Sequence, residues 1–183
     1  MKKILLFMLL AVVCACSSQD DDDALTGEKG IADMEVPVEV NPVSMSELTK
    51  ALNGKTWYVE EQYEVNVKGE VTLDFRKEHW LGNSLRVIEV RDNNIKMYLS
   101  TDALVRNQYE TSYTYDERRN LFRTKAEIGG LPSEFIVLSV SDKEIRLFGE
   151  PLYGSSKETT YGIYSIQPLD EEVQKAFDTA WNV

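Results

Sequence analysis

The order of apolar and polar positions divides the chain into three parts. Residues 4–13 are apolar without interruption, and a polar, acidic stretch follows them. From residue 56 onward, short runs alternate between apolar and polar side chains and are separated by polar turns. Alternation with a period of two is typical of half-buried β-strands. The pattern therefore predicts an all-β body behind an N-terminal region of a different kind.

The alternating runs predict about nine strands joined by short turns. In one run, Val71, Leu73 and Phe75 lie on one face and polar side chains on the other. Asp and Asn residues between such runs, as at 92–94, are typical of tight hairpin turns. The expected strands are 56–65, 70–76, 84–90, 95–100, 107–115, 120–128, 134–140, 144–150 and 159–166.

The connections between these runs are too short to hold the crossover helices of a parallel sheet, so the strands are expected to be antiparallel. An open antiparallel meander of this length would expose two long edges, and closure into a barrel removes them. The sequence therefore predicts an all-β fold: an antiparallel up-and-down β-barrel of eight to nine strands.

A helix is expected at each end of this body. Ser44 and Glu47 have the spacing of a capping box, and Gly54 can end the first helix in the left-handed conformation. Asp170 can cap a second helix after Pro168. The apolar residues that share one face of this second helix are Val173, Ala176, Phe177, Ala180 and Trp181. That face is expected to pack on the barrel wall.

The apolar run near the N-terminus predicts a signal peptide over residues 1–15. It follows Lys2 and Lys3 and is shorter than the about 20 residues that span a bilayer. The segment 13–16, Val-Cys-Ala-Cys, resembles the lipobox of bacterial lipoproteins. The resemblance implies that Cys16 becomes the lipidated first residue of a membrane-tethered protein. An ordinary secretory signal with incidental cysteines is the alternative.

Residues 16–43 are expected to form a flexible acidic linker, because a block of like charges repels itself and extends. Acidic residues behind a lipidated cysteine are similar to the export signal of surface lipoproteins in one group of Gram-negative bacteria. The residues that carry this likeness are Asp20, Asp21, Asp22 and Asp23. It implies a lipid anchor in the outer membrane with exposure at the cell surface; a plain solvated spacer is the alternative.

Composition narrows the classes of partner. Removal of residues 1–15 leaves 168 residues and takes the formal net charge from −11 to −13, since Lys2 and Lys3 are lost. A chain of this charge is a poor partner for nucleic acid. Both cysteines lie in the lipobox segment, so the body cannot form an internal disulfide.

The start of the body resembles the lipocalin-like lipoproteins of Gram-negative bacteria. Residues 52–57, Leu-Asn-Gly-Lys-Thr-Trp, are similar to the segment that opens the first strand of such barrels, although two residues rather than one separate Gly54 from Trp57. The resemblance covers residues 44–168 and implies a lipocalin-like domain over 44–183 with its C-terminal helix. Helix capping by Gly54 and core packing by Trp57 are the simpler explanations of these residues.

Few residues offer catalytic chemistry. His79 is the single histidine of the chain, so a nucleophile–histidine site could form only there. A zinc site would have to combine His79 with carboxylates alone, and no Gly-rich phosphate loop is present. The 31 acidic residues leave an acid–base pair open by count alone. We therefore expect no enzyme activity, no catalytic residue, no metal and no cofactor.

The most suggestive constellation is a row of tyrosines. Tyr109, Tyr113 and Tyr115 alternate along one strand and project to one face. The candidate ligand contacts are Tyr109, Tyr113, Tyr115, Trp57 and Trp80. A barrel of about eight strands is either packed solid or able to hold one small ligand. Two functions stay open: a lipid-anchored envelope protein that binds a small, partly apolar ligand, or an accessory subunit of a cell-surface assembly with a solid barrel.

Overall fold

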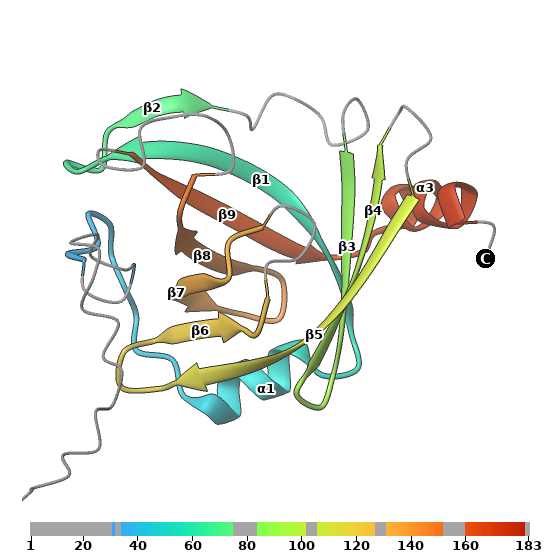
Figure 1. Cartoon of the computed structure of the whole chain (residues 1–183), viewed down its shortest axis with the longest axis horizontal. Coiled ribbons are helices and arrows are strands. Elements are labelled where there is room, and N and C mark those ends of the chain that lie inside the picture. Colours follow the sequence, from blue (N-terminus) through green and yellow to red (C-terminus); the bar gives the residue numbers. More distant parts are fainter. Residues whose placement is uncertain are drawn as a thin grey trace, which may run out of the picture.

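In the described part of the chain, eight antiparallel strands close into a barrel, and a ninth strand lies outside the ring (Figure 1). The computed structural model describes residue 31 and residues 34–74, 84–101, 106–126, 131–151 and 160–181. Within these residues the strands are β1 (Thr56–Asn66), β2 (Val71–Asp74), β3 (Ser84–Arg91), β4 (Asn94–Thr101), β5 (Arg106–Asp116), β6 (Leu121–Thr124), β7 (Glu134–Val140), β8 (Ile145–Gly149) and β9 (Thr160–Pro168). The helices are α1 (Met45–Leu52) and α3 (Glu171–Trp181). The predicted fold class is confirmed, and such a closed barrel is consistent with the lipocalin-like resemblance.

The ring closes through β1, which is long enough to pair with three other strands. Along one side it pairs with β9 over nearly its whole length. Along the other side, Thr56–Tyr58 pair with β3, whereas Tyr63–Val65 pair with β2. Strand β2 therefore extends the sheet beyond the ring instead of belonging to it, and its four residues are exposed. The alternating pattern of residues 70–76 indicated a strand but could not show this position.

Helix α1 closes one end of the barrel. The Ser44 hydroxyl accepts a hydrogen bond from the Glu47 N–H at 3.2 Å, and the Glu47 carboxylate accepts one from the Ser44 N–H at 2.8 Å. The Ser44 hydroxyl also donates to the Glu47 carboxylate at 2.7 Å, and this bond, together with the one from the Ser44 N–H, lowers the pKa of Glu47 because both favour its charged form. Gly54 follows the helix with a φ of 73°. The predicted capping box and left-handed glycine are thus both confirmed.

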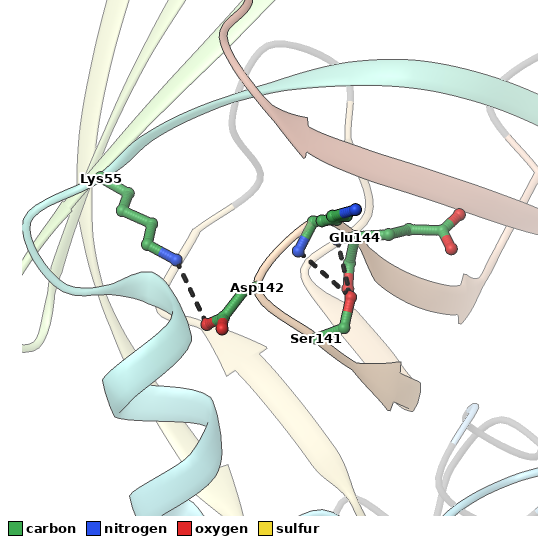
Figure 2. Close-up of polar contacts among 5 residues, drawn as sticks. Lys55, Ser141, Asp142 and Glu144 are labelled. Carbon is green, nitrogen blue, oxygen red and sulfur yellow. Dashed lines mark hydrogen bonds and ion pairs between the residues drawn. The ribbon is translucent and has the colours of Figure 1, made fainter.

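The link from α1 to β1 lies beside the turn between β7 and β8 (Figure 2). The Lys55 ammonium is 3.5 Å from the Asp142 carboxylate. The Ser141 hydroxyl organises the turn by accepting from the N–H groups of Lys143 and Glu144. Because the Asp142 side chain is 83% exposed, the ion pair contributes little to stability. It joins the link before β1 to the turn between β7 and β8.

The barrel has apolar clusters on both sides of its wall. The interior cluster contains Leu48 and Leu52 of α1 together with inward side chains such as Trp57, Met97 and Val137. On the outside, Ile31 and the half-buried Met34, Val36 and Val38 pack against β1, β7, β8 and β9. These contacts lie within residues 16–43, the stretch that the sequence assigned to the linker.

The Asn120 side chain links residues 41–43 to the barrel by hydrogen bonds. Its side-chain oxygen accepts from the Val43 N–H at 3.2 Å. Its amide nitrogen donates to the carbonyls of Asn41, at 2.6 Å, and Val137, at 3.0 Å. Asn120 is buried and has a φ of 49°, a left-handed conformation that asparagine tolerates better than most residues. The side chain of one turn residue therefore bonds two other segments, residues 41–43 and strand β7.

Helix α3 packs on the outer wall, as the sequence predicted. Val173 and Phe177 are buried against β1 and β3. The Tyr98 ring meets the rings of Phe177 and Trp181 edge-on, each with centroids 5.1 Å apart. In the part of the chain that the structure describes, neither helix is long and apolar enough to cross a membrane.

Candidate functional site

The tyrosines of β5 share one face, as their alternation predicted, and in the structure this face is the inner one. Tyr113 and Tyr115 belong to the interior cluster, and the half-buried Tyr109 packs against it. The Tyr115 hydroxyl donates to the Val43 carbonyl at 2.8 Å, and the Tyr113 hydroxyl to the Asp92 carbonyl at 3.2 Å. Burial raises the pKa of Tyr113, and it raises that of Tyr115 to about 12. Two of the three candidate tyrosines thus bond the barrel's own backbone.

Trp57 is fully buried in the same interior. The Lys55 ammonium lies 5.6 Å from the centre of its ring, and its indole N–H has no hydrogen-bond partner in the described part of the chain. Trp80, His79, Cys16 and the acidic run at 20–23 lie outside the described residues. Ligand contact by the tyrosines and tryptophans stays a prediction.

The interior next to α1 is nearly filled. A cavity of about 60 Å³ lies there, and its lining includes Leu48, Leu52, Phe122, Phe135 and Ile145. Pockets for small molecules usually measure roughly 300 Å³ or more. An apolar cavity of the observed size is a packing gap, so this half of the barrel is essentially a solid core.

The opposite half of β1 carries polar side chains into the barrel. The pairing of β1 with β9 shifts by one residue between Val59 and Glu61. Without this bulge, Glu61, Tyr63 and Val65 would continue the inward face of Val59. Because of it, Tyr63 and Val65 join the outer cluster. Residues 62 and 64 take the inward positions instead, opposite Tyr164 and Gly162 of β9.

Gln62 and Glu64 are buried at these positions without satisfying their polar atoms. Glu64 is 1% exposed and Gln62 is 9% exposed. Neither carboxylate oxygen of Glu64 has a hydrogen-bond partner among the described residues, nor does the side-chain nitrogen of Gln62. A buried ionised carboxylate is costly unless it is paired. Such groups in a folded protein call for an explanation, and a role in binding is one.

The side chains around Glu64 are shaped for close packing. The Tyr164 ring folds back over Gly162, so that a Cβ at residue 162 would lie 2.5 Å from the tyrosine oxygen. A Cβ at Gly149, the partner of Gly162 on β8, would lie 2.8 Å from the Phe135 ring. The two rings meet edge-on with centroids 5.5 Å apart. Glu64 on β1 is thus followed, across the neighbouring strands β9 and β8, by Gly162 and Gly149. The lack of side chains at these two glycines leaves space for the rings of Tyr164 and Phe135.

Arg86 of β3 faces the same interior, because it alternates with the inward Ile88 and Val90. It is half-buried and has contacts of its own. None of these contacts is a hydrogen bond to a Glu64 oxygen, since both oxygens lack a partner. An acid and an amide on β1 and a guanidinium on β3 thus face the barrel interior. Among these three side chains, the described structure leaves polar atoms of Glu64 and Gln62 without partners.

Sequence reasoning missed Gln62 and Glu64. Residues 56–65 read as one strand, and its imperfect alternation, in which apolar and acidic residues fall out of step after Val59, was the available signal. A one-residue bulge reverses which side chains face inward, and its position follows from pairing with β9, which is about 100 residues away.

No known family model matches this chain, and no curated protein matches it in sequence. Within the described residues, no group of three or more His, Cys, Asp or Glu side chains could hold a metal ion.

Proposed function

We propose that the protein binds a small, partly apolar ligand inside its barrel, at the end away from α1. The observation that supports this most is a pair of buried inward side chains. Among the described residues, both carboxylate oxygens of Glu64 and the side-chain nitrogen of Gln62 lack hydrogen-bond partners. Because a strand rises about 3.3 Å per residue, Glu64 lies about 20 Å along β1 from Trp57. The ligand's apolar part would then lie against interior side chains such as Tyr109.

The anchoring is part of the same proposal. We infer that Cys16 carries the lipid and that the protein is held at the outer membrane, facing the cell surface, with the acidic residues 20–23 acting in export. A Cys16→Ala variant is expected to leave the membrane fraction, and surface proteolysis of intact cells tests which side the domain occupies. Retention of that variant in the membrane would overturn lipidation at Cys16.

Binding is tested by titrating the mature protein with a panel of lipids and aromatic compounds while following tryptophan fluorescence. A saturable change is expected with at least one partly apolar compound, and it should weaken in a Tyr109→Ala variant. A matched Tyr98→Ala change, on the outer face, should leave the affinity unaltered. A flat response across the panel, together with a crystal structure in which the whole interior is filled, would overturn the proposal.

A second candidate function, that of an accessory subunit, is favoured by β2. Among the described strands β2 pairs only with β1, so its other edge is open to a partner strand. Val71 and Leu73 on this strand are 48% and 40% exposed, and Val67 in the preceding turn is 60% exposed. An open apolar edge is where an extended segment of a partner protein would add to the sheet.

This candidate predicts that a Leu73→Asp change removes a specific co-purifying envelope protein, since an aspartate opposes both apolar contact and strand pairing. A Lys68→Asp change in the neighbouring exposed turn is the matched control and should preserve the complex. Equal recovery of the partner with both variants would exclude β2 as the docking edge.

A further inference from the structure

We infer that the ligand of the barrel carries a positively charged amine, and that Glu64 is the residue that binds it. This inference rests on the proposed binding function and names the chemistry of the ligand at the site. Glu64 presents two acceptor atoms, both buried and both without a partner among the described residues. An ionised carboxylate has no donor, so only a donor-bearing group can complete it.

Charge selects an ammonium over a neutral donor. Removing a carboxylate from water costs free energy, and direct contact with an opposite charge offsets this cost best. Charge-assisted hydrogen bonds are about twice as strong as neutral ones. A hydroxyl group would satisfy one oxygen of Glu64 but leave its charge unbalanced. A primary ammonium has three donors and can engage both oxygens.

The surroundings favour an organic cation over a metal ion. Glu64 is a single carboxylate, and the described residues hold no group of three potential ligands. Gln62 lies two residues away on the same face, and its side-chain nitrogen also lacks a partner. Two residues of strand separate them by about 7 Å. An amine with an oxygen acceptor at that distance from its nitrogen would satisfy both side chains.

Isothermal titration calorimetry with three probes of equal length tests the inference. The mature protein is titrated at fixed ionic strength and neutral pH with n-hexylammonium, n-hexanol and hexanoate. Hexylammonium is expected to bind at least ten-fold more tightly than hexanol, and hexanoate most weakly. The Glu64→Gln variant should lose at least ten-fold in affinity for hexylammonium and change less than two-fold for hexanol.

Glu61→Gln is the matched control, because Glu61 lies on the same strand at an outward position opposite Ser165. Its affinity for hexylammonium should equal that of the unmodified protein. Equal binding of hexylammonium by Glu64→Gln would overturn the role of Glu64, and stronger binding of hexanoate would point to Arg86 instead. Hexanol binding without any preference for the amine would leave the binding function standing and reject the charge. No binding of any probe would reject this inference, while the lipid and aromatic panel decides the function separately.

Discussion

Glu64 and Gly162 lie directly opposite each other across the ladder between β1 and β9, on the inward face of the barrel. The absence of a side chain at residue 162 is what allows the Tyr164 ring to fold over that position. The wall beside Glu64 is thereby lined with an aromatic ring instead of a second polar group. A bulge in one strand and a glycine in the next together define the environment of the buried acid.

Gly162→Ala is expected to destabilise the protein by about 1–3 kcal/mol, because the added methyl group would collide with the Tyr164 oxygen and ring. Chemical denaturation measures the change. Gly54→Ala is the control for conformation alone: residue 54 has open space around it and a φ of 73°, so about 1 kcal/mol is expected. A Gly162→Ala variant as stable as the unmodified protein would show that the ring does not occupy this position.

Asn120→Ala is expected to lower the free energy of unfolding by about 3 kcal/mol or more. The change removes hydrogen bonds to Val43, Asn41 and Val137 and leaves buried backbone groups unpaired. Asn120→Gly removes the same bonds but relieves the left-handed backbone, so it should recover about 1 kcal/mol of that loss in urea denaturation. Identical stability of the two variants would contradict the φ of 49°.

Phe177→Ala is expected to cost about 3 kcal/mol, because Phe177 is buried between α3 and the outer wall and meets the Tyr98 ring edge-on. Trp181 fluorescence should shift toward that of a solvated indole as α3 loosens. Gln174→Ala, on the exposed face of the same helix, should stay within about 0.5 kcal/mol. Equal effects of the two substitutions would mean that α3 is not docked through this face.

Stability is expected to fall in alkaline solution as Tyr115 ionises. Burial raises the pKa of its hydroxyl from 10.0 to about 12, so the folded state holds this proton more tightly than the unfolded state. Its contribution is complete below about pH 10 and is lost as the pH rises toward 12, by up to about 2 kcal/mol. The loss between these values should be smaller in Tyr115→Phe. Denaturation midpoints that decline in parallel for both proteins would rule out Tyr115 as the cause.

The patterning of the sequence was sufficient to predict the barrel class. Period-two alternation, turn residues and the helix caps at Ser44 and Gly54 are local signals, and each corresponds to an element of the structure. The alternation of Tyr109, Tyr113 and Tyr115 was also enough to place them on one face, which proved to be the inner one.

The site depended on relations that are not local. The Glu64 side chain points inward because of a bulge whose position is set by pairing with β9. Strand β2 lies outside the ring because one edge of β1 pairs with β3 near its start and with β2 near its end. The hydroxyl of Tyr115 has a partner, Val43, 72 residues away in the chain. Strand periodicity specifies which residues share a face, but the register against distant strands decides which face is inside and which polar atoms lack partners.

The most direct test of the binding site is the free energy of unfolding of Glu64→Gln, measured by urea denaturation without any added ligand. If Glu64 is a binding group held without a partner in the free protein, removal of its charge should stabilise the fold by about 1–3 kcal/mol. Glu61→Gln should leave the stability within about 0.5 kcal/mol. A Glu64→Gln protein that is less stable than the unmodified one would contradict the account, because it would show that the carboxylate is already held by the barrel's own groups.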